Sequence, residues 1–281
     1  MSEIEANSQY FKFKVVNIVL YPEGQQLKKN YIDILEKIYK EKKTVHTHGE
    51  RCTLIRTFYK SADSNIIHGD ISNALFLNPQ DMALDSKTNE IVQSNADPDK
   101  GFGLKIWNYF FFPEYHRLVI DSTASEKQLL KFLDETFNIY MRQDDYEINM
   151  EKDRQTIERI INAPALSKLL VRVSYSNNDN EEGWEGIIDR QLKDSCSKNA
   201  KLELKANKKA PIQISKSEMV KGFIKLSASN GYAEASEIEE DGTITHITTQ
   251  DHPLINTVSY IDDGLGVKLK DFVKRIAHKE I

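Results

Sequence analysis

The 281-residue chain has only two cysteines, no long apolar run and no excess of basic residues, and each of these shortages excludes a class of protein. Cys52 and Cys196 form neither a CxxC pair nor another metal-ligand spacing, so we expect two free thiols in a reducing cytoplasm. The longest apolar runs, such as 106–113 and 166–173, are much shorter than the roughly 20 residues that cross a bilayer. We therefore expect a cytoplasmic protein without a membrane-spanning segment.

The composition is that of a folded protein. Its hydrophobic content of 40% is sufficient for a core, and its net charge of −5 excludes a protein that coats nucleic acid with its whole surface. The first ten residues lack the basic and apolar regions of a secretory signal, which supports the expected cytoplasmic location.

Apolar residues alternate in the segments that predict strands and recur every three or four residues in those that predict helices. The N-terminal elements are predicted as a strand at 11–21, a helix at 25–42, a strand at 50–60, strand segments at 104–112 and 116–121, a helix at 125–137 and a strand at 145–153. This β-α-β-β-α-β order is the split βαβ of a ferredoxin-like domain. Residues 61–103, in which Asp, Asn, Ser and Gly are scattered, are expected to be an insertion.

The second half has its own mixture of helices and strands. Residues 166–175 predict a buried strand, 232–250 a hairpin and 267–278 a final helix. The predicted fold class is therefore α+β, with a ferredoxin-like domain at 1–153 and a smaller mixed α/β domain at 154–281.

One residue set resembles the metal site of a PD-(D/E)xK nuclease, which holds a divalent ion between an Asp and a Glu beside a Lys. Here the candidates are Asp189, Glu203 and Lys205. No PD dipeptide precedes Asp189, which falls in a predicted helix, and an exposed strand with alternating charges explains Glu203 and Lys205 equally well. The three residues remain an alternative catalytic site only.

Other patterns give no recognised catalytic motif. His46, His48, Glu50 and Cys52 would share one face of an extended chain, but Gly49 favours a turn there, and a polar loop is the simpler interpretation. The sequence contains no Walker P-loop, GxSxG or HExxH motif. We expect no cofactor and no metal, and the sequence leaves open whether the chain is an enzyme.

Charge is separated along the chain. Residues 193–225 contain nine Lys against three acids, a net +6, and residues 28–60 carry a net +5. Such separation predicts a basic face that could meet phosphates, although ordinary solvated surfaces remain the competing interpretation. The predicted nucleic-acid-binding residues are Lys201, Lys205, Lys208, Lys209, Lys221 and Lys225.

Several short blocks together resemble an uncharacterised bacterial family, classed as a domain of unknown function and found in mobile and phage-defence regions. The blocks are Asn17-Ile18-Val19 with Tyr21-Pro22, Tyr109 to Leu118, Ser176 to Asp179, Ser229 to Tyr232 and Thr248 to Pro253. One departure is that Ser176 stands where the family tends to have proline. The residues of interest within the blocks are Pro113, His116, Asn177, Asp179, Asn230 and Gly231.

The resemblance implies a role in bacterial conflict but no catalytic residues. Our first hypothesis is a non-enzymatic component of an anti-phage defence system that binds or senses DNA or RNA through the 193–225 segment. The alternatives are a metal-dependent nuclease or toxin, and a subunit that binds a protein partner from the same operon. The oligomeric state is open, with a homo-oligomer among the outcomes.

Overall fold

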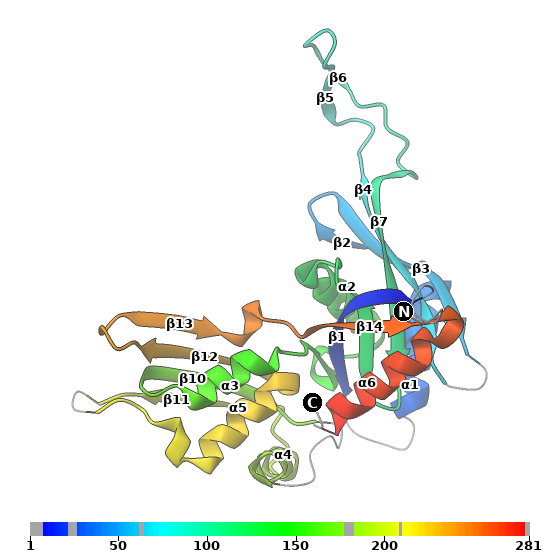
Figure 1. The fold of residues 1–281 in the computed structure, drawn as a ribbon. Coiled ribbons are helices and arrows are strands. Elements are labelled where there is room, and N and C mark those ends of the chain that lie inside the picture. Colours follow the sequence, from blue (N-terminus) through cyan, green and yellow to red (C-terminus); the bar gives the residue numbers. More distant parts are fainter. Residues whose placement is uncertain (1–7, 22–26, 62–64, 177–182, 208–209, 279–281) are drawn as a thin grey trace.

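The computed structural model describes residues 8–21, 27–61, 65–176, 183–207 and 210–278, and these form a mixed α/β fold (Figure 1). The first elements are β1 (Gln9–Leu20), α1 (Leu27–Lys40), β2 (Val45–His48), β3 (Arg51–Lys60), β4 (Ile67–Phe76), β5 (Met82–Leu84), β6 (Ile91–Gln93), β7 (Gly101–Phe112), β8 (Arg117–Asp121), α2 (Glu126–Tyr140) and β9 (Tyr146–Met150). They are followed by α3 (Arg154–Asn162), β10 (Leu166–Ser174), α4 (Gly183–Asp194), β11 (Asn199–Lys205), α5 (Glu218–Asn230), β12 (Gly231–Ile238), β13 (Ile244–Thr248), β14 (Ile255–Tyr260) and α6 (Leu265–Ala277). Among these helices, none has both the length and the apolar character needed to cross a membrane.

Eight of the described strands form an antiparallel sheet around β1. The order is β14-β1-β8-β7-β4-β3-β2, and β9 also pairs with β1. β14 pairs with residues 9–14 of β1 and β9 with residues 16–20, so the two strands share one edge of β1. This central position explains why β1 is apolar along most of its length.

The two faces of β1 contribute to different cores. Val16 and Ile18 point to one face and pack in the cluster that includes residues of α1 and α2. Phe11 and Phe13 point to the other face, where the ring centroids of Phe13 and Phe272 of α6 are 5.0 Å apart. Successive side chains of a strand alternate between faces, so a strand covered on both sides must be apolar at nearly every position.

The ferredoxin-like arrangement is not confirmed. The strand beside β8 is β7 rather than β3, and β2, β3 and β4 extend the same sheet. The structure also corrects the extent of the predicted insertion at 61–103, because β4 is a paired strand within that range. β4 carries the buried polar residues Asp70 and Asn73, which interrupt its apolar pattern. Arg56 pairs with Asp70 at 2.5 Å, and Asn73 Nδ2 donates to Thr53 Oγ1 at 2.8 Å.

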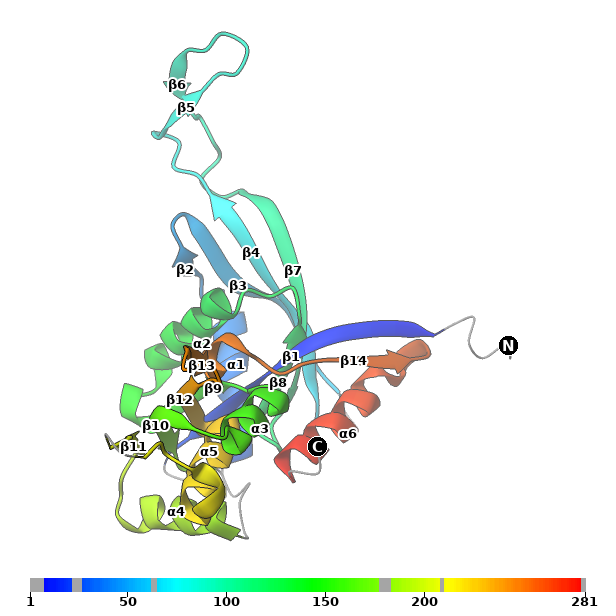
Figure 2. The same ribbon diagram turned by 60° about the vertical axis from the view of Figure 1, so that its left-hand side comes forward.

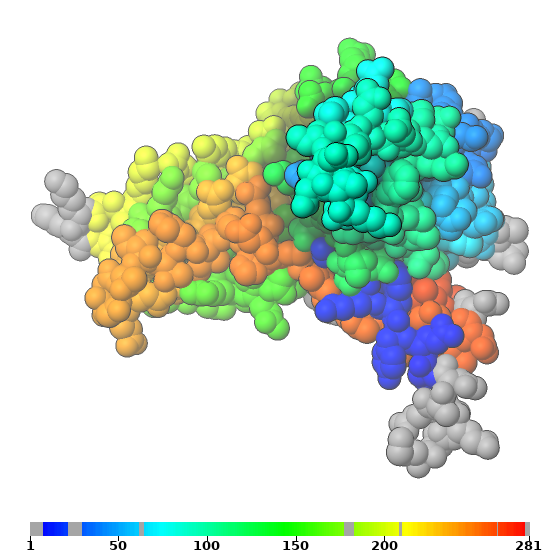
Figure 3. Space-filling model, turned by 90° about the horizontal axis from the view of Figure 1, so that it is seen from above, coloured from blue at the N-terminus to red at the C-terminus, as the bar shows by residue number. Residues whose placement is uncertain are grey.

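Residues 77–100, between β4 and β7, leave the sheet as an extended arm that projects away from the body (Figures 1 and 2). The hairpin of β5 and β6 forms its tip. Seen from above, the arm stands over the first sheet, and β12 and β13 lie to one side (Figure 3). The arm is the part of the predicted insertion that lies outside the main sheet.

A second, four-stranded antiparallel sheet has the order β11-β10-β12-β13. The helices α3, α4 and α5 lie on one side of it (Figure 1). Leu169, Val171 and Val173 of β10 point to that side and pack in a core with Val220 and Ile224 of α5. We call the opposite side of this sheet the outer face.

After β13 the chain returns to the first sheet. β14 pairs with β1, and α6 packs its Leu269 and Phe272 in the core that contains Phe13. Residues 255–277 therefore pack on the first sheet, while the domain boundary between residues 153 and 154 stays a prediction.

A buried polar cluster joins the two sheets, and we call it the joint. Asn17 of β1 donates through Nδ2 to Asn230 Oδ1 at 2.9 Å and to the Ser229 carbonyl at 3.0 Å. Arg117 of β8 donates to Asn17 Oδ1 at 2.6 Å and forms an ion pair with Glu151, 2.7 Å from Nε to Oε1. Ser229 Oγ donates to Glu151 Oε2 at 2.8 Å. The Arg117 and Glu151 side chains are only 1% and 3% exposed, so their charges depend on each other.

Gly231 fixes the position of the joint residues that precede it. Its φ of +152° is disfavoured for residues with a side chain. A Cβ at this position would lie 2.0 Å from the carbonyl oxygen of Arg172. The absence of a side chain therefore lets β12 begin directly against β10, with Asn230 turned toward Asn17.

We expect Arg117→Ala to lower the free energy of unfolding by about 3–5 kcal/mol, because it leaves the Glu151 carboxylate buried without its ion-pair partner. Urea denaturation followed by circular dichroism measures this loss. Lys100→Ala, at an exposed arm ion pair, should change stability by less than about 0.5 kcal/mol and serves as the control. A loss below about 1 kcal/mol for Arg117→Ala would contradict the role given to the joint.

Candidate functional site

The outer face of the four-stranded sheet carries polar side chains in rows that cross the strands. Residues directly opposite each other in antiparallel strands project to the same side, so the register defines the rows. Three successive rows are Lys201, Arg172 and Tyr232; Glu203, Leu170 and Glu234; and Lys205, Lys168 and Ser236. Two rows with cations therefore flank one row with carboxylates.

Ion pairs within the outer face neutralise part of the charge of these rows. Glu203 Oε1 lies 3.3 Å from Lys205 Nζ and 3.7 Å from Lys168 Nζ. The hydrogen bond from the Lys205 ammonium holds the pKa of the Glu203 carboxyl below its ordinary value. The three rows together contain four cations and two carboxylates, a net charge of +2 for these rows.

The outer face is hollowed toward β12 and β13. A cavity of about 530 Å³ is lined by residues that include Lys168, Leu170, Glu234 and His246. Ser236 Oγ and His246 Nδ1 are 3.0 Å apart and share a hydrogen bond across the two strands. The cavity gives the face an apolar floor at Leu170 with polar groups around it.

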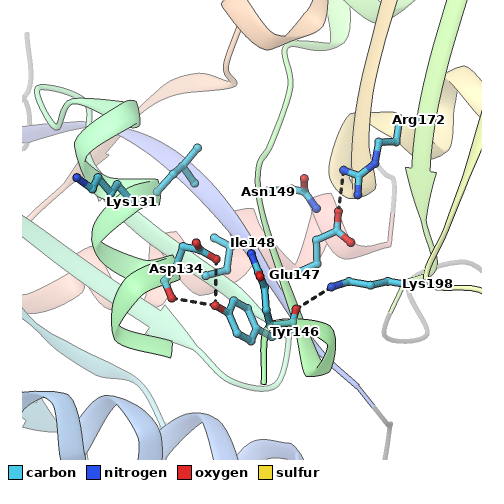
Figure 4. A pocket seen from close by; sticks show the side chains of 10 residues that line it. Lys131, Asp134, Tyr146, Glu147, Ile148, Asn149, Arg172 and Lys198 are labelled. Carbon is cyan, nitrogen blue, oxygen red and sulfur yellow. Dashed lines mark hydrogen bonds and ion pairs between the residues drawn. The ribbon is translucent and has the colours of Figure 1, made fainter. Parts of the chain in front are cut away.

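A second cavity, of about 490 Å³, adjoins the Arg172 end of the outer face (Figure 4). We call it the cleft. It lies between α2, β9 and β10, and its cationic lining residues are Lys131, Arg172 and Lys198. Glu147 points across it toward Arg172, with 3.5 Å between Oε1 and the guanidinium (Figure 4). Arg172 thus belongs to both the cleft and a cationic row of the outer face.

Two polar atoms of β9 are available in the cleft. Within the described residues, Glu147 Oε2 and Asn149 Nδ2 are buried and have no hydrogen-bond partner. They are two residues apart on one strand and so lie on the same face. Buried polar atoms normally find partners, so this acceptor and donor suit a ligand with a complementary polar edge.

The Tyr146 hydroxyl, by contrast, already has hydrogen-bond partners. It lies 2.8 Å from the Asp134 carbonyl and 3.0 Å from Asp134 Oδ1. Burial raises the pKa of the Tyr146 phenol, and the hydrogen bond to Asp134 raises it further. The phenol therefore keeps its proton at neutral pH and acts as a fixed wall of the cleft.

The structure separates the lysines that the sequence assigned to one basic face. Lys201 and Lys205 project from β11 on the outer face. Lys221 and Lys225 lie on α5, on the other side of the sheet, where they pair with Glu218 at 2.6 Å and Glu185 at 4.0 Å. Lys208 and Lys209 lie outside the described residues.

The three residues of the nuclease hypothesis are also divided. Asp189 is buried on α4, where Oδ1 accepts from Ser176 N–H at 2.5 Å and Oδ2 lies 3.0 Å from Lys193 Nζ. Ser176 follows the end of β10, whereas Glu203 lies opposite Leu170, about 13 Å from that end at 3.3 Å per residue. Glu203 and Lys205 are thus neighbours, and Asp189 lies apart from them.

Of the potential metal ligands predicted at residues 46–52, the structure brings two into contact. His46 and Cys52 lie opposite each other in the β2–β3 hairpin, with 3.4 Å between Nδ1 and Sγ. Across the described ranges, no group of three or more His, Cys, Asp or Glu residues is placed to hold a metal ion.

Three of the five blocks that carry the family resemblance meet at the joint. Asn17, Arg117 and Asn230 come from three of them and are linked by hydrogen bonds. Pro113 and His116 are in the connection between β7 and β8. Asn177 and Asp179 lie outside the described residues.

Sequence reasoning did not identify the cleft. The only signal for it was the alternation of the predicted strand at 145–153, which places Glu147 and Asn149 on one face. Nothing in the sequence indicated that this face meets Arg172.

We expect Asp189→Ala to lower the free energy of unfolding by at least about 2 kcal/mol, because Ser176 N–H and Lys193 then lose a buried acceptor. Glu203→Ala, on the exposed strand, should cost less than about 0.5 kcal/mol. Thermal and urea denaturation of both variants measure the difference. Equal stability of the two variants would show that Asp189 has no structural role.

Comparisons with curated proteins and with protein families bear on the identity of the chain. A search of the curated proteins finds no match to the chain. The family described as "Domain of unknown function (DUF4747)" matches residues 9–277, which include all of the helices and strands described above. The chain therefore belongs to the DUF4747 family of domains of unknown function.

Proposed function

We propose that the chain binds single-stranded nucleic acid across the outer face of the four-stranded sheet. The observation that carries this proposal is the register of β10, β11 and β12, which places Lys168, Arg172, Lys201 and Lys205 beside Tyr232 on one side of the sheet. Cations bind the phosphates of any sequence, and an aromatic ring offers a surface on which a base can stack. The chain's net charge of −5 does not oppose this, because binding depends on the local field.

The cleft extends the same surface. A strand that follows the row of Lys201, Arg172 and Tyr232 reaches the cleft at Arg172. There, the available acceptor of Glu147 and donor of Asn149 can meet the polar edge of a base, while Lys198 and Lys131 line the entrance.

The biological setting is part of the proposal. A non-enzymatic, cytoplasmic role in bacterial anti-phage defence rests on the resemblance of the sequence blocks, and the outer face supplies the means of sensing nucleic acid. The choice between DNA and RNA is decided by the binding experiment below.

The direct test replaces Lys201 and Lys205 together by Glu. Four phosphate contacts on a single strand predict a slope of log K against log salt of about −3, from roughly −0.7 per contact. Lys201→Glu/Lys205→Glu should reduce that slope by about half and weaken binding at least tenfold at about 0.1 M salt. Fluorescence anisotropy of labelled single-stranded DNA and RNA, with EDTA present, measures both quantities.

The matched control is Lys221→Glu/Lys225→Glu, which changes the net charge by the same amount on the opposite side of the sheet. We expect it to retain most of the affinity. Equal weakening by both pairs would contradict a defined face and indicate a general effect of charge. Cleavage that requires magnesium or manganese and is lost in Glu203→Ala would support the nuclease alternative instead.

A further inference from the structure

The arm carries an apolar stripe in solvent. In the β5–β6 hairpin Leu84 lies opposite Ile91, and Met82 is two residues from Leu84, so the three side chains share one face. Met82, Leu84 and Ile91 are 65%, 67% and 71% exposed. Contiguous apolar surface of this kind is typical of interaction sites.

The same molecule has an apolar groove at the opposite end of the β4–β7 pair. The groove has a volume of about 720 Å³ and lies where β1, β4, β7 and β14 meet the start of α6. Its lining includes Ile66, Phe110, Tyr260, Leu265 and Val267. Val267, at the rim, is 63% exposed.

The tip cannot fill its own groove. Phe110 in the groove and Gly101 at the base of the arm are nine residues apart on β7, roughly 30 Å at 3.4 Å per residue. The tip lies beyond Gly101, on the side away from α6 (Figures 1 and 2). Any tip that occupies the groove must therefore come from another molecule.

An apolar track connects the two features. Leu104 and Ile106 are two residues apart on β7, on the Phe110 side of the bulge at Gly103, and are 56% and 45% exposed. They are on the same face of the strand as Phe110, so the track leads from the arm toward the groove.

The arm and helix α6, which borders the groove, carry opposite net charges. The arm has five acids and two lysines, a net −3, whereas α6 has four bases and one acid, a net +3. Asp262 also lines the groove, where Lys87 in the β5–β6 turn of an incoming arm could face it.

We propose that two copies of this chain form a symmetric dimer in which the arms lie antiparallel. The tip of each arm occupies the groove of the other copy, and the two tracks of Leu104 and Ile106 face each other near the two-fold axis. In a two-fold interface every contact occurs twice, once in each direction. Here the tip of the first copy would contact the groove of the second, and the tip of the second would contact the groove of the first. The proposal does not depend on nucleic-acid binding.

The mass of the full-length chain by light scattering, across a concentration series, tests the dimer. We expect about twice 32.4 kDa. Leu84→Asp/Ile91→Asp at the tip, and separately Val267→Asp at the groove, should each raise the dimer dissociation constant at least about tenfold. Ile139→Asp, at a 51% exposed position on α2, is the matched control and should leave the dimer unchanged.

Mixing the two kinds of variant gives the sharpest result. The tip variant keeps an intact groove and the groove variant keeps an intact tip, so one native tip–groove contact re-forms in a mixed dimer. We expect the mixture to associate more tightly than either variant alone. A wild-type chain that stays monomeric, or a dimer unaffected by the tip variant while circular dichroism shows both variants folded, would overturn the proposal.

Discussion

The buried ion pair between Arg117 and Glu151, with the Asn17–Asn230 hydrogen bond beside it, is the constraint on which the rest of the structure depends. It ties the central strand of the large sheet to the turn at which α5 ends and β12 begins. Buried charges are costly unless each has its partner, so the pair favours one arrangement of the two sheets over others. Gly231 adds a steric condition, because a side chain there would collide with β10.

The geometry of the candidate site follows from this joint. Glu147, Asn149 and Glu151 alternate along one face of the chain at β9, so the attachment of Glu151 to Arg117 also fixes the direction in which Glu147 and Asn149 point. The four-stranded sheet then brings Arg172 opposite Glu147 to close the cleft. Because the helices of the second half cover only the inner side of that sheet, the cationic rows remain on the outer face (Figure 1).

The sequence predicted local structure better than the pairing of distant segments. Strand β1 and helix α2 were predicted from their periodicity, and the α+β class is confirmed. β4 was missed because Asp70 and Asn73 are buried in it with partners on β3, and sequence periodicity treats such residues as signs of a loop. The basic segment at 193–225 was one run in sequence, but a strand and a helix that pack on each other place their exposed sides in opposite directions. The cleft combines residues from both halves, and only tertiary structure brings them together.

Photochemical cross-linking of a single-stranded oligonucleotide, followed by mapping of the modified peptides, tests the central claim most directly. The outer-face account predicts cross-links in β10, β11 and the start of β12, within residues 168–172, 199–205 and 231–234. Cross-links confined to α4 and α5, on the opposite side of the four-stranded sheet, would contradict it.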